Sequence, residues 1–215
     1  EDVNGQWEVG ARFLYEEGND ADKIVNLSRI FPIILTLLTI ILTYFFAREL
    51  LGKTIVRVFD DGSRVEAMIT ETEAYHGFDD KASHASRKKT ERNKIMFGKA
   101  GLVYVYLVYG IHYCLNFVTM EDGFPAAVLI RGIAMSPQSA ICNLKSAIIS
   151  GPGRVCRVLQ IDKSLYGEDL AKSKRLWVED GIVIGKSAIL ASKRVGVEYA
   201  EESKDLLWKF KLQNP

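Results

Sequence analysis

Two apolar-rich runs around an Asp-Gly turn constrain the fold of this chain more than any other feature. The runs are residues 54–59 and 64–75, and the turn between them is Asp60-Asp61-Gly62-Ser63. This pattern predicts a β-hairpin, because an Asp-Gly pair matches the twist that joins two antiparallel strands. Further β-rich runs follow with short connections at residues 102–109, 112–120, 126–133, 177–183 and 193–197. Strands joined by hairpins predict an α+β fold, a curved antiparallel sheet with surrounding helices.

The length of the chain sets its domain organisation. With 215 residues, of which 48% are hydrophobic, it suits one good-sized core and a single domain. Residues 1–29 hold seven acidic and three basic side chains without a sustained apolar period, which predicts a poorly ordered acidic extension. The functional domain is therefore expected over residues 30–215. Inside it, the polar stretch 79–100 predicts a long loop with a helical turn, 136–150 a loop or weak helix, and 154–159 a helix.

Residues 30–47 contain no charged side chain, which is just long enough for a membrane span. The stretch includes Pro32 and three threonines, and it follows an acidic segment. A secretory signal would begin with positive charge and end at a small-residue cleavage site, and neither is visible. We expect a buried helix from about residue 32 to residue 51, ending at Gly52, and we expect no membrane partner. A membrane or interfacial segment is the alternative.

The cysteines and histidines have neither the spacing of a disulfide frame nor that of a metal site. Cys114, Cys142 and Cys156 are odd in number, lack CxxC spacing and lie in or beside apolar runs. They are typical of reduced core residues in a cytoplasmic protein. The three histidines lack HExxH spacing and cysteine companions, so we predict no metal.

Carboxylates continue the apolar face of the run 64–75. If this run is a strand with period two, one face carries Val65, Ala67, Ile69, Glu71, Glu73 and Tyr75. A carboxylate on the core side of a strand is costly unless it is paired or faces a cavity. A catalytic carboxylate is one interpretation, and a strand end that emerges into solvent is the other.

Two further clusters carry possible chemistry. Tyr104 and Tyr106 share a strand face, and Tyr109 precedes Gly110 in a predicted tight turn that would direct its ring outward. Such rings can form a surface on which nucleic-acid bases stack, or simply a tyrosine-rich core. The stretch 87–94, together with Lys99 just after it, holds six cations and one acid, which would supply phosphate contacts or form a solvated surface.

Several short motifs in order resemble those of the alkyladenine (3-methyladenine) DNA glycosylase family. They are Ala47-Arg-Glu-Leu-Leu-Gly-Lys53, Glu71-Thr-Glu-Ala-Tyr75, His84, Arg92-Asn93 before Met96-Phe97, Tyr104-Val-Tyr-Leu-Val-Tyr-Gly110, Cys114-Leu-Asn116, Val128-Leu-Ile-Arg131, Gly151-Pro152-Gly153 and Arg194-Val-Gly-Val197. Each motif is weak alone, but the ordered set covers about residues 47–212. The resemblance ends before residue 47, since family members usually reach the Leu-Leu-Gly motif through a shorter, mixed segment.

The resemblance implies a monofunctional enzyme that flips alkylated or deaminated purines out of double-stranded DNA and hydrolyses the N-glycosidic bond. Glu73 would activate a water, and Arg131 would hold that water and keep Glu73 ionised. The extruded base would lie in a pocket formed by four side chains, Tyr75, His84, Tyr106 and Asn116. No cofactor is implied, and a monomer is expected. Because no lysine lies beside the Glu73 motif, we expect no Schiff-base step.

The resemblance also implies how DNA would be held. Tyr109 would wedge into the minor groove and fill the gap left by the flipped nucleotide, with Ile111 beside it in the same turn. Four cations of the polar stretch would contact phosphates: Arg87, Lys88, Lys89 and Arg92. These assignments predict that the basic loop (residues 87–99) and the tyrosine turn (residues 108–111) face the same duplex.

Three other functions fit part of the pattern. A glycoside hydrolase could use Glu71 and Glu73, whose Cα atoms would be about 6.6 Å apart on a strand. A non-catalytic module could bind damaged nucleic acid without breaking a bond, and a small membrane protein would use the apolar stretch 30–47. The hydrolase interpretation leaves the basic loop and the outward tyrosine without a role.

Overall fold

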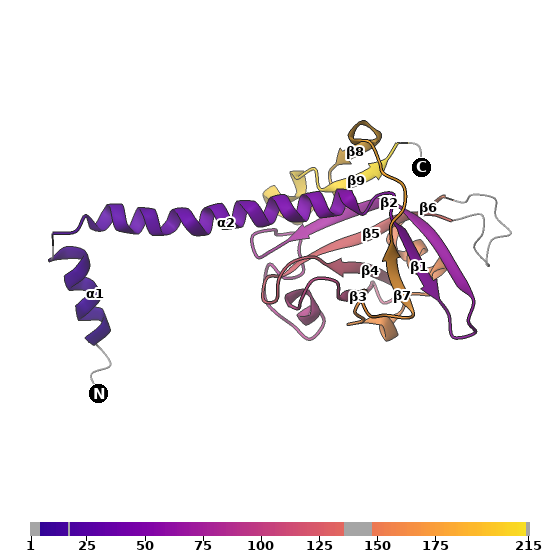
Figure 1. Ribbon diagram of the computed structural model, residues 1–215, viewed down its shortest axis with the longest axis horizontal. Coiled ribbons are helices and arrows are strands. Elements are labelled where there is room, and N and C mark those ends of the chain that lie inside the picture. The colour runs from indigo at the N-terminus through magenta and orange to yellow at the C-terminus, as the bar shows by residue number, and fades with distance from the viewer. Residues whose placement is uncertain (1–4, 17, 136–147, 214–215) are drawn as a thin grey trace. The chain divides into compact units, whose positions relative to one another are not determined.

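The computed structural model describes residues 5–16, 18–135 and 148–213. The chain divides into two compact units, residues 1–41 and residues 42–215. The first unit contains helix α1 (Gly5–Tyr15) and most of helix α2 (Ala21–Glu49), and the second contains the end of α2 and the whole sheet (Figure 1). Each unit is described by itself below.

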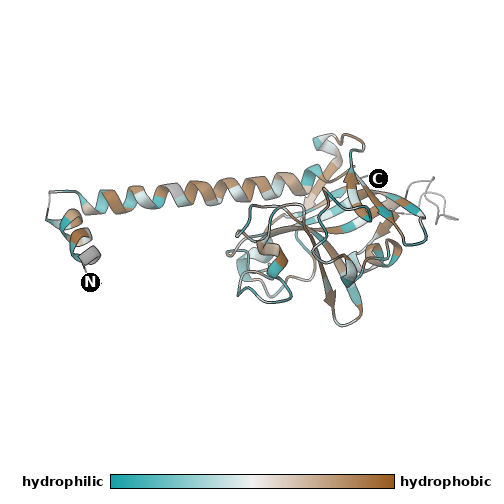
Figure 2. Cartoon of the chain, turned by 60° about the horizontal axis from the view of Figure 1, so that its bottom comes forward, coloured by the Kyte–Doolittle hydropathy of each residue, from teal (hydrophilic) through white to brown (hydrophobic). Residues whose placement is uncertain are grey.

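The first unit is helical, which differs from two sequence expectations. Residues 5–15 form α1, where we had expected irregular structure, and α2 begins at residue 21, about ten residues earlier than expected. The prediction that the apolar stretch is a buried helix is wrong, because only 18% of the most hydropathic 18-residue window of α2 is buried. The apolar colour along α2 in Figure 2 therefore marks side chains that are largely exposed.

The second unit is built on a nine-stranded sheet in which every pairing is antiparallel. Along the sheet the strands are ordered β3-β4-β5-β2-β1-β7. In addition, β6 pairs with β5, and β9 pairs with both β2 and β8. The strands are β1 (Thr54–Val58), β2 (Arg64–His76), β3 (Val103–Val108), β4 (His112–Val118), β5 (Ala126–Met135), β6 (Ile148–Ser150), β7 (Leu176–Glu179), β8 (Ile189–Ser192) and β9 (Lys209–Leu212). The predicted α+β class with an antiparallel sheet is confirmed.

Short helices connect the strands. Helix α3 (Pro152–Val158) packs on β4 and β5, and four 3-10 turns lie at Lys94–Phe97, Lys163–Leu165, Lys186–Ala188 and Glu201–Asp205. The turn at Lys94–Phe97 is the helical turn expected inside the long polar loop. The strand expected at residues 193–197 is absent from this segment, which is irregular, and β8 ends just before it. The loop or weak helix expected over residues 136–150 lies mostly outside the described residues. Its described part, residues 148–150, is the strand β6.

A double irregularity lies at the centre of the longest strand pair, β2 and β5. The register shifts on both sides of Glu71, so that Ile69 pairs with Ile133, Glu71 with Gly132 and Thr72 with Ile130. Thr70 on β2 and Arg131 on β5 are therefore skipped, as in a β-bulge. Before the bulge Ile69 belongs to the apolar core, whereas after it Ala74 does.

The bulge reverses which face of β2 meets the core. Thr72 faces the core side, as Ala74 does, and its hydroxyl donates to the Ala47 carbonyl at 2.8 Å. Glu71, Glu73 and Tyr75 therefore lie on the face opposite to that of Ile69. The expectation that one unbroken face runs from Val65 to Tyr75 is wrong, because strict alternation of side chains holds only where the ladder is regular.

Candidate active site

A cavity of about 650 Å³ opens on the face of the sheet that carries the carboxylates. Its walls come from strands β2 to β5, from the polar loop around residues 82–96, from Gly151 and helix α3, and from the segment 195–199. Central among the lining residues are Glu73, Tyr75, His84, Arg92, Tyr104, Tyr106, Tyr109, Asn116, Leu129, Arg131, Val195 and Tyr199. The volume and the aromatic lining suit a planar heterocycle.

Glu73 is completely buried at the inner end of the cavity. One carboxylate oxygen accepts the backbone N–H of Val195 at 3.1 Å and lies 3.5 Å from Arg131 Nε. The other accepts the phenol of Tyr75 at 3.0 Å. Burial raises the pKa of Glu73, and this outweighs Arg131 and the two hydrogen bonds, which favour the ionised form. A carboxylate of raised pKa held by donors is suited to accept a proton.

Arg131 contacts Glu71 more closely than Glu73. Its Nε donates to Glu71 Oε1 at 3.0 Å, and the same oxygen lies 3.0 Å from Lys209 Nζ. The second oxygen of Glu71 accepts the Ser150 hydroxyl at 3.0 Å. The pKa of Glu71 is lowered although burial raises it, because the hydrogen bond and charge of Lys209, Ser150 and Arg131 together outweigh burial. Glu71 and Glu73 thus have different surroundings two residues apart.

Aromatic side chains form the walls above Glu73. The rings of His84 and Tyr106 meet edge to face with centroids 4.5 Å apart, and Tyr104 and Tyr106 are 5.1 Å apart. Burial raises the pKa of Tyr75 and of Tyr106 well above the ordinary value, so both phenols stay protonated. Desolvation, with the nearby charge of Arg92, lowers the pKa of His84 to about 4, although the residue is exposed. His84, Tyr75 and Tyr106 are therefore uncharged at neutral pH, and the positive charge of the cavity lining comes from arginines.

Asn116 lies at the floor of the cavity and is 2% exposed. Its side-chain nitrogen donates to the backbone carbonyl of Tyr104 at 3.1 Å, which fixes the amide in one orientation. The structure thus brings together Glu73, Arg131, Tyr75, His84, Tyr106 and Asn116, the six residues expected from sequence to perform catalysis and hold a base. An amide held at a cavity floor can select between ligands by which polar edge they present.

The tyrosine turn extends from the sheet beside the cavity. Tyr109 and Gly110 have φ values of 52° and 71°, and Ile111 N–H donates to the Val108 carbonyl, as in the type I′ turn of a hairpin. A positive φ is unusual for tyrosine, and glycine adopts it freely. The Tyr109 side chain is 92% exposed and Ile111 is 72% exposed. The expectation that this ring points outward is confirmed.

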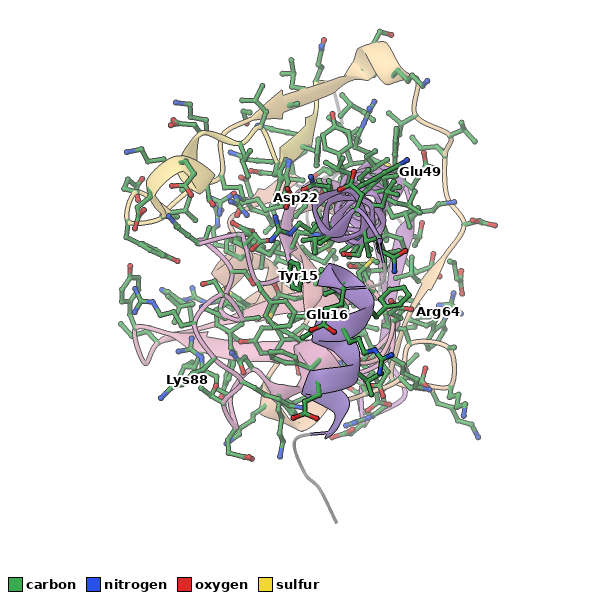
Figure 3. All side chains as sticks on the ribbon, turned by 90° about the vertical axis from the view of Figure 1, so that its left-hand side faces the viewer. Tyr15, Glu16, Asp22, Glu49, Arg64 and Lys88 are labelled. Carbon is green, nitrogen blue, oxygen red and sulfur yellow. The ribbon has the colours of Figure 1, made fainter. Side chains whose placement is uncertain are left out.

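The basic loop has a more mixed environment than its composition suggests. Arg87 and Lys88 are exposed, and the side chain of Lys88 is directed away from the domain in Figure 3. Lys89 lies over the Phe97 ring at 5.1 Å. Arg92, expected to contact phosphate, lines the cavity instead: its guanidinium lies over the Tyr106 ring at 5.1 Å and donates to the Leu107 carbonyl.

Two further cations of this loop are paired with acids. Lys94 binds Glu91 at 2.7 Å and Lys99 binds Asp169 at 2.6 Å. These ion pairs reduce the positive charge that the loop can offer to a polyanion, because a paired cation is already partly neutralised. Within the stretch 87–89, all three cations remain exposed.

Sequence reasoning missed several residues that support the site. Lys209 comes to Glu71 from β9, and Val195 donates its N–H to Glu73. Arg194 is buried behind Tyr75, where its guanidinium lies 4.9 Å from the ring and pairs with Asp80 at 2.5 and 2.8 Å. The only sequence signal was the Arg194-Val-Gly-Val197 motif, which carried no role.

The described part of the chain holds no group of three His, Cys, Asp or Glu side chains arranged to bind a metal ion. Cys114 and Cys156 are free and buried, and burial raises the pKa of the Cys114 thiol to about 11. Cys142 lies outside the described residues. The side chains that line the cavity include the buried carboxylate of Glu73, four arginines and a set of aromatic rings.

Comparisons with known proteins agree with this arrangement. The family model described as methylpurine-DNA glycosylase matches residues 42–215, which is the whole of the second unit. A protein of Methanocella arvoryzae is 47% identical over 76% of this chain and 84% of its own length, and one of Desulfitobacterium hafniense is 46% identical over 78% and 89%. Both carry the name "Putative 3-methyladenine DNA glycosylase". A match of this extent and identity, over the same residues that build the cavity, means that the chain belongs to the methylpurine-DNA glycosylase family.

Proposed function

We propose that this protein is a DNA glycosylase that removes alkylated or deaminated purines from double-stranded DNA, with Glu73 activating the water that attacks C1′ of the sugar. Family membership supports a glycosylase for alkylated bases. The observation that carries the mechanism is the position of Glu73, fully buried at the inner end of an aromatic-walled cavity. Breaking an N-glycosidic bond gives the sugar oxocarbenium character, which a nearby carboxylate stabilises.

The flipped base lies between Tyr75, His84 and Tyr106. A purine methylated at N3 or N7 carries positive charge, and neutral rings attract such a cation through their π faces. His84 is neutral at physiological pH because its pKa is lowered to about 4, so it does not repel the charged base. Asn116 at the floor excludes normal guanine by a clash with the exocyclic amino group. Neutral lesions such as hypoxanthine require protonation by the site.

The duplex is held by the tyrosine turn and the basic loop. Tyr109 fills the gap left by the flipped nucleotide, which its exposure and its position at the cavity mouth support. Ile111 contacts the duplex beside it. Arg87, Lys88 and Lys89 contact phosphates, so raising salt from about 50 to 200 mM weakens binding by about 40-fold. Arg92 acts from within the cavity, since its guanidinium stacks on Tyr106.

The enzyme works as a monofunctional hydrolase without cofactor, as a monomer, in the cytoplasm. The cations among the described residues that line the cavity are arginines, and the nearby amine of Lys209 is held by Glu71, so no lysine is offered for a Schiff base. The free thiols Cys114 and Cys156 suit a reducing compartment.

Glycoside hydrolysis by a Glu71–Glu73 pair is not supported. Glu71 is absent from the residues that line the cavity, and its two oxygens are occupied by Arg131, Lys209 and Ser150. A carboxylate held in this way has no open face toward a sugar, whereas a hydrolytic pair needs both groups beside the bond that breaks.

The experiment that tests the proposal compares wild-type protein with Glu73→Gln. Both are incubated with duplexes containing methylated purine, hypoxanthine or ethenoadenine, and abasic sites are revealed by alkali and a gel. We expect Glu73→Gln to lower base release by about 10³-fold or more while damaged-duplex binding is kept. Glu66→Gln on the other half of β2, where Glu66 pairs with Arg64, is the matched control and stays active.

Base release by Glu73→Gln at the wild-type rate would show that Glu73 is not the base. Binding without release by the wild-type protein would instead identify a non-catalytic module.

A further inference from the structure

We propose that α2 inserts the exposed apolar face of its uncharged segment, residues 30–47, into a lipid bilayer and so attaches the glycosylase to a membrane, while the opposite face at Thr43 and Ala47 stays packed on the domain. This inference goes beyond the proposed function and does not depend on it. The segment has a mean hydropathy of 2.4 over 18 residues, and 18% of it is buried. An uncharged helix with this many exposed apolar side chains is stabilised by an apolar environment that covers them.

The distribution of apolar side chains around α2 favours lipid over a protein partner. Most of the large apolar side chains described between positions 30 and 46, such as Ile33, Leu37 and Leu42, are 41–58% exposed. At about 100° per residue they cover roughly 220° of the helix circumference. A helix that packs on a protein surface needs an apolar stripe of about 100°. One second copy would cover a stripe, whereas a bilayer surrounds the helix.

The length of the segment fits the bilayer. Eighteen residues at about 1.5 Å each span about 27 Å, close to the hydrocarbon thickness of about 30 Å. Arg29 and Arg48 bound the segment, and arginine side chains can reach the headgroup region from the ends of a spanning helix. Beyond them, Asp22 and Glu49 mark the two ends of α2 in Figure 3.

Two of the three threonine hydroxyls of the segment are satisfied inside the helix, and the third, that of Thr43, lies 3.0 Å from His76 Nδ1. The Thr36 hydroxyl donates to the Pro32 carbonyl at 2.9 Å, and the Thr39 hydroxyl donates to the Thr36 carbonyl at 2.8 Å. Hydrocarbon offers no hydrogen bonds, so this self-pairing lowers the cost of moving threonine into lipid. A proline within the helix, here Pro32, is also tolerated in membrane helices.

The end of α2 is part of the glycosylase core, which argues that the helix is retained. Ala47 is fully buried and its carbonyl accepts the Thr72 hydroxyl, and Leu50 just beyond belongs to the same core cluster. Cleavage at the end of the apolar segment, as in a secretory signal, would remove side chains that this core contains. Insertion therefore attaches the domain to the membrane without a separate linker.

Vesicle flotation of the full chain tests this proposal. The protein is mixed with vesicles of equal parts phosphatidylcholine and phosphatidylglycerol, washed with carbonate at high pH and floated in a sucrose gradient. We expect wild type to float, and Leu35→Arg/Leu38→Arg to lower the floated fraction by about tenfold or more, since charge at the centre of a span is costly. The control Val183→Arg/Leu190→Arg adds the same charge at exposed apolar positions of the other unit and still floats.

Three results would overturn membrane insertion: wild type remaining at the bottom of the gradient, release by carbonate, or flotation of Leu35→Arg/Leu38→Arg equal to wild type. A vesicle-free wild type that sediments as a soluble dimer would show that a second copy covers the helix. Base release by Leu35→Arg/Leu38→Arg in solution shows that the domain is folded, so failure of this proposal is distinct from failure of the glycosylase assignment.

A second observation carries an independent inference, which rests on the proposed function: the structure assigns Glu71 and Lys209 as positioning residues that hold Arg131 against Glu73. Glu71 Oε1 joins Arg131 Nε and Lys209 Nζ, both at 3.0 Å, while Arg131 Nε lies 3.5 Å from Glu73. Two carboxylates (Glu71 and Glu73) and two cations (Arg131 and Lys209) thus form one connected charge network. Lys209 is also the strand partner of Glu73 in the β2–β9 pair.

The charge of Lys209 acts on Glu73 through this arrangement. The ionisable groups that face Glu73 are Arg131 from β5, Lys209 from β9, Tyr75 from β2, Tyr106 from β3 and Cys114 from β4, with Glu71 behind Arg131. Arg131 and Lys209 both favour the ionised carboxylate. Loss of Lys209 therefore makes Glu73 harder to ionise and frees Glu71 to compete for Arg131.

The pH dependence of base release tests this role. In single-turnover assays we expect Lys209→Met to move the acid limb to higher pH with damaged-duplex affinity unchanged, and Lys209→Arg to restore the wild-type profile. Lys211→Met, an exposed lysine on the same strand, is the matched control and keeps the wild-type profile. Lys209→Gln serves if Lys209→Met does not fold.

An unshifted acid limb in both Lys209→Met and Lys209→Gln would overturn the positioning role. Glu73→Gln measured alongside separates this outcome from the main proposal, because its loss of activity shows that Glu73 is the base whatever Lys209 does.

Discussion

The two halves of β2 bury different kinds of side chain. Before the bulge, Val65, Ala67 and Ile69 face the apolar core and are fully buried. After it, Glu71 and Glu73 are just as inaccessible, but they face a charged network and a cavity. Burial of a strand residue therefore does not reveal whether the residue stabilises the fold or performs chemistry. The hydrogen-bond partners and the face decide it.

Removing a core side chain before the bulge gives the largest effect on stability. Ile69→Ala leaves a cavity in the close-packed core, which costs about 2–5 kcal/mol of unfolding free energy. Because Ile69 faces away from the cavity, base release per folded molecule should stay near wild type. Urea denaturation and single-turnover assays measure the two quantities. A loss of chemistry comparable to that of Glu73→Gln would mean that the two halves are not separate.

Closing the space at the bulge should disturb both halves. A Cβ on Gly132 would lie 2.7 Å from the Glu71 Cβ and 3.0 Å from the Thr70 hydroxyl, so Gly132→Ala must shift β5 or β2. A displacement of about 1 Å at a catalytic group lowers rates by about 100-fold, and we expect that loss in base release. Gly185→Ala serves as the control, since its Cβ would meet no atom closer than 4.0 Å. Wild-type activity of Gly132→Ala would show that the bulge can relax without moving Glu73.

The raised pKa of Glu73 sharpens the comparison in solution. Because burial raises it, the carboxylate is ionised only above a pH higher than that of a free glutamate, whose pKa is about 4.3. Base release should therefore fall about tenfold per pH unit below that point, and remain on the plateau above it. A rate profile for a methylated purine measures this. An acid limb at or below the pKa of a free glutamate would contradict the desolvated carboxylate.

The smallest effect is expected at the tyrosine turn, outside β2. Tyr109→Ser removes an exposed ring at the cavity mouth and leaves the contacts of Glu73 in place, so preference for duplex over single-stranded substrate should fall by about 10-fold, the value of roughly one stacking contact. Competition between the two substrates measures it. An unchanged preference would show that Tyr109 is not the wedge. The control is Phe78→Ser, which removes another exposed aromatic ring and should keep the wild-type preference.

Much of this arrangement could be predicted from sequence because local patterns carry it. The hairpins β1–β2 and β3–β4 and the strand β5 follow from β-rich runs and turn residues, whereas the strand expected at residues 193–197 is absent. The outward Tyr109 follows from the glycine after it. Glu73, Tyr75 and Asn116 were expected from short motifs. The predicted assignment of roles to these residues remains a proposal that the experiments above address.

What the sequence could not reveal depends on distance or on backbone irregularity. Lys209 is 138 positions from Glu71, and no local pattern links a lysine on the last strand to that carboxylate. The bulge is invisible to a period-two interpretation, because Thr70 and Arg131 look like ordinary strand residues. The exposure of α2 was missed because apolar periodicity does not distinguish a helix surrounded by protein from one that its own chain leaves uncovered.

The paired skips on β2 and β5 decide where this strand pair can tolerate a change of length. Deleting Thr70 would remove only the extra residue, so that Glu71 and Glu73 would keep their side of the sheet. Deleting Thr72 instead would exchange the two sides of everything that follows, sending Glu73 into the apolar core and Ala74 into the cavity. Deletion of Thr70 should therefore leave the protein folded and active, whereas deletion of Thr72 should abolish both folding and activity.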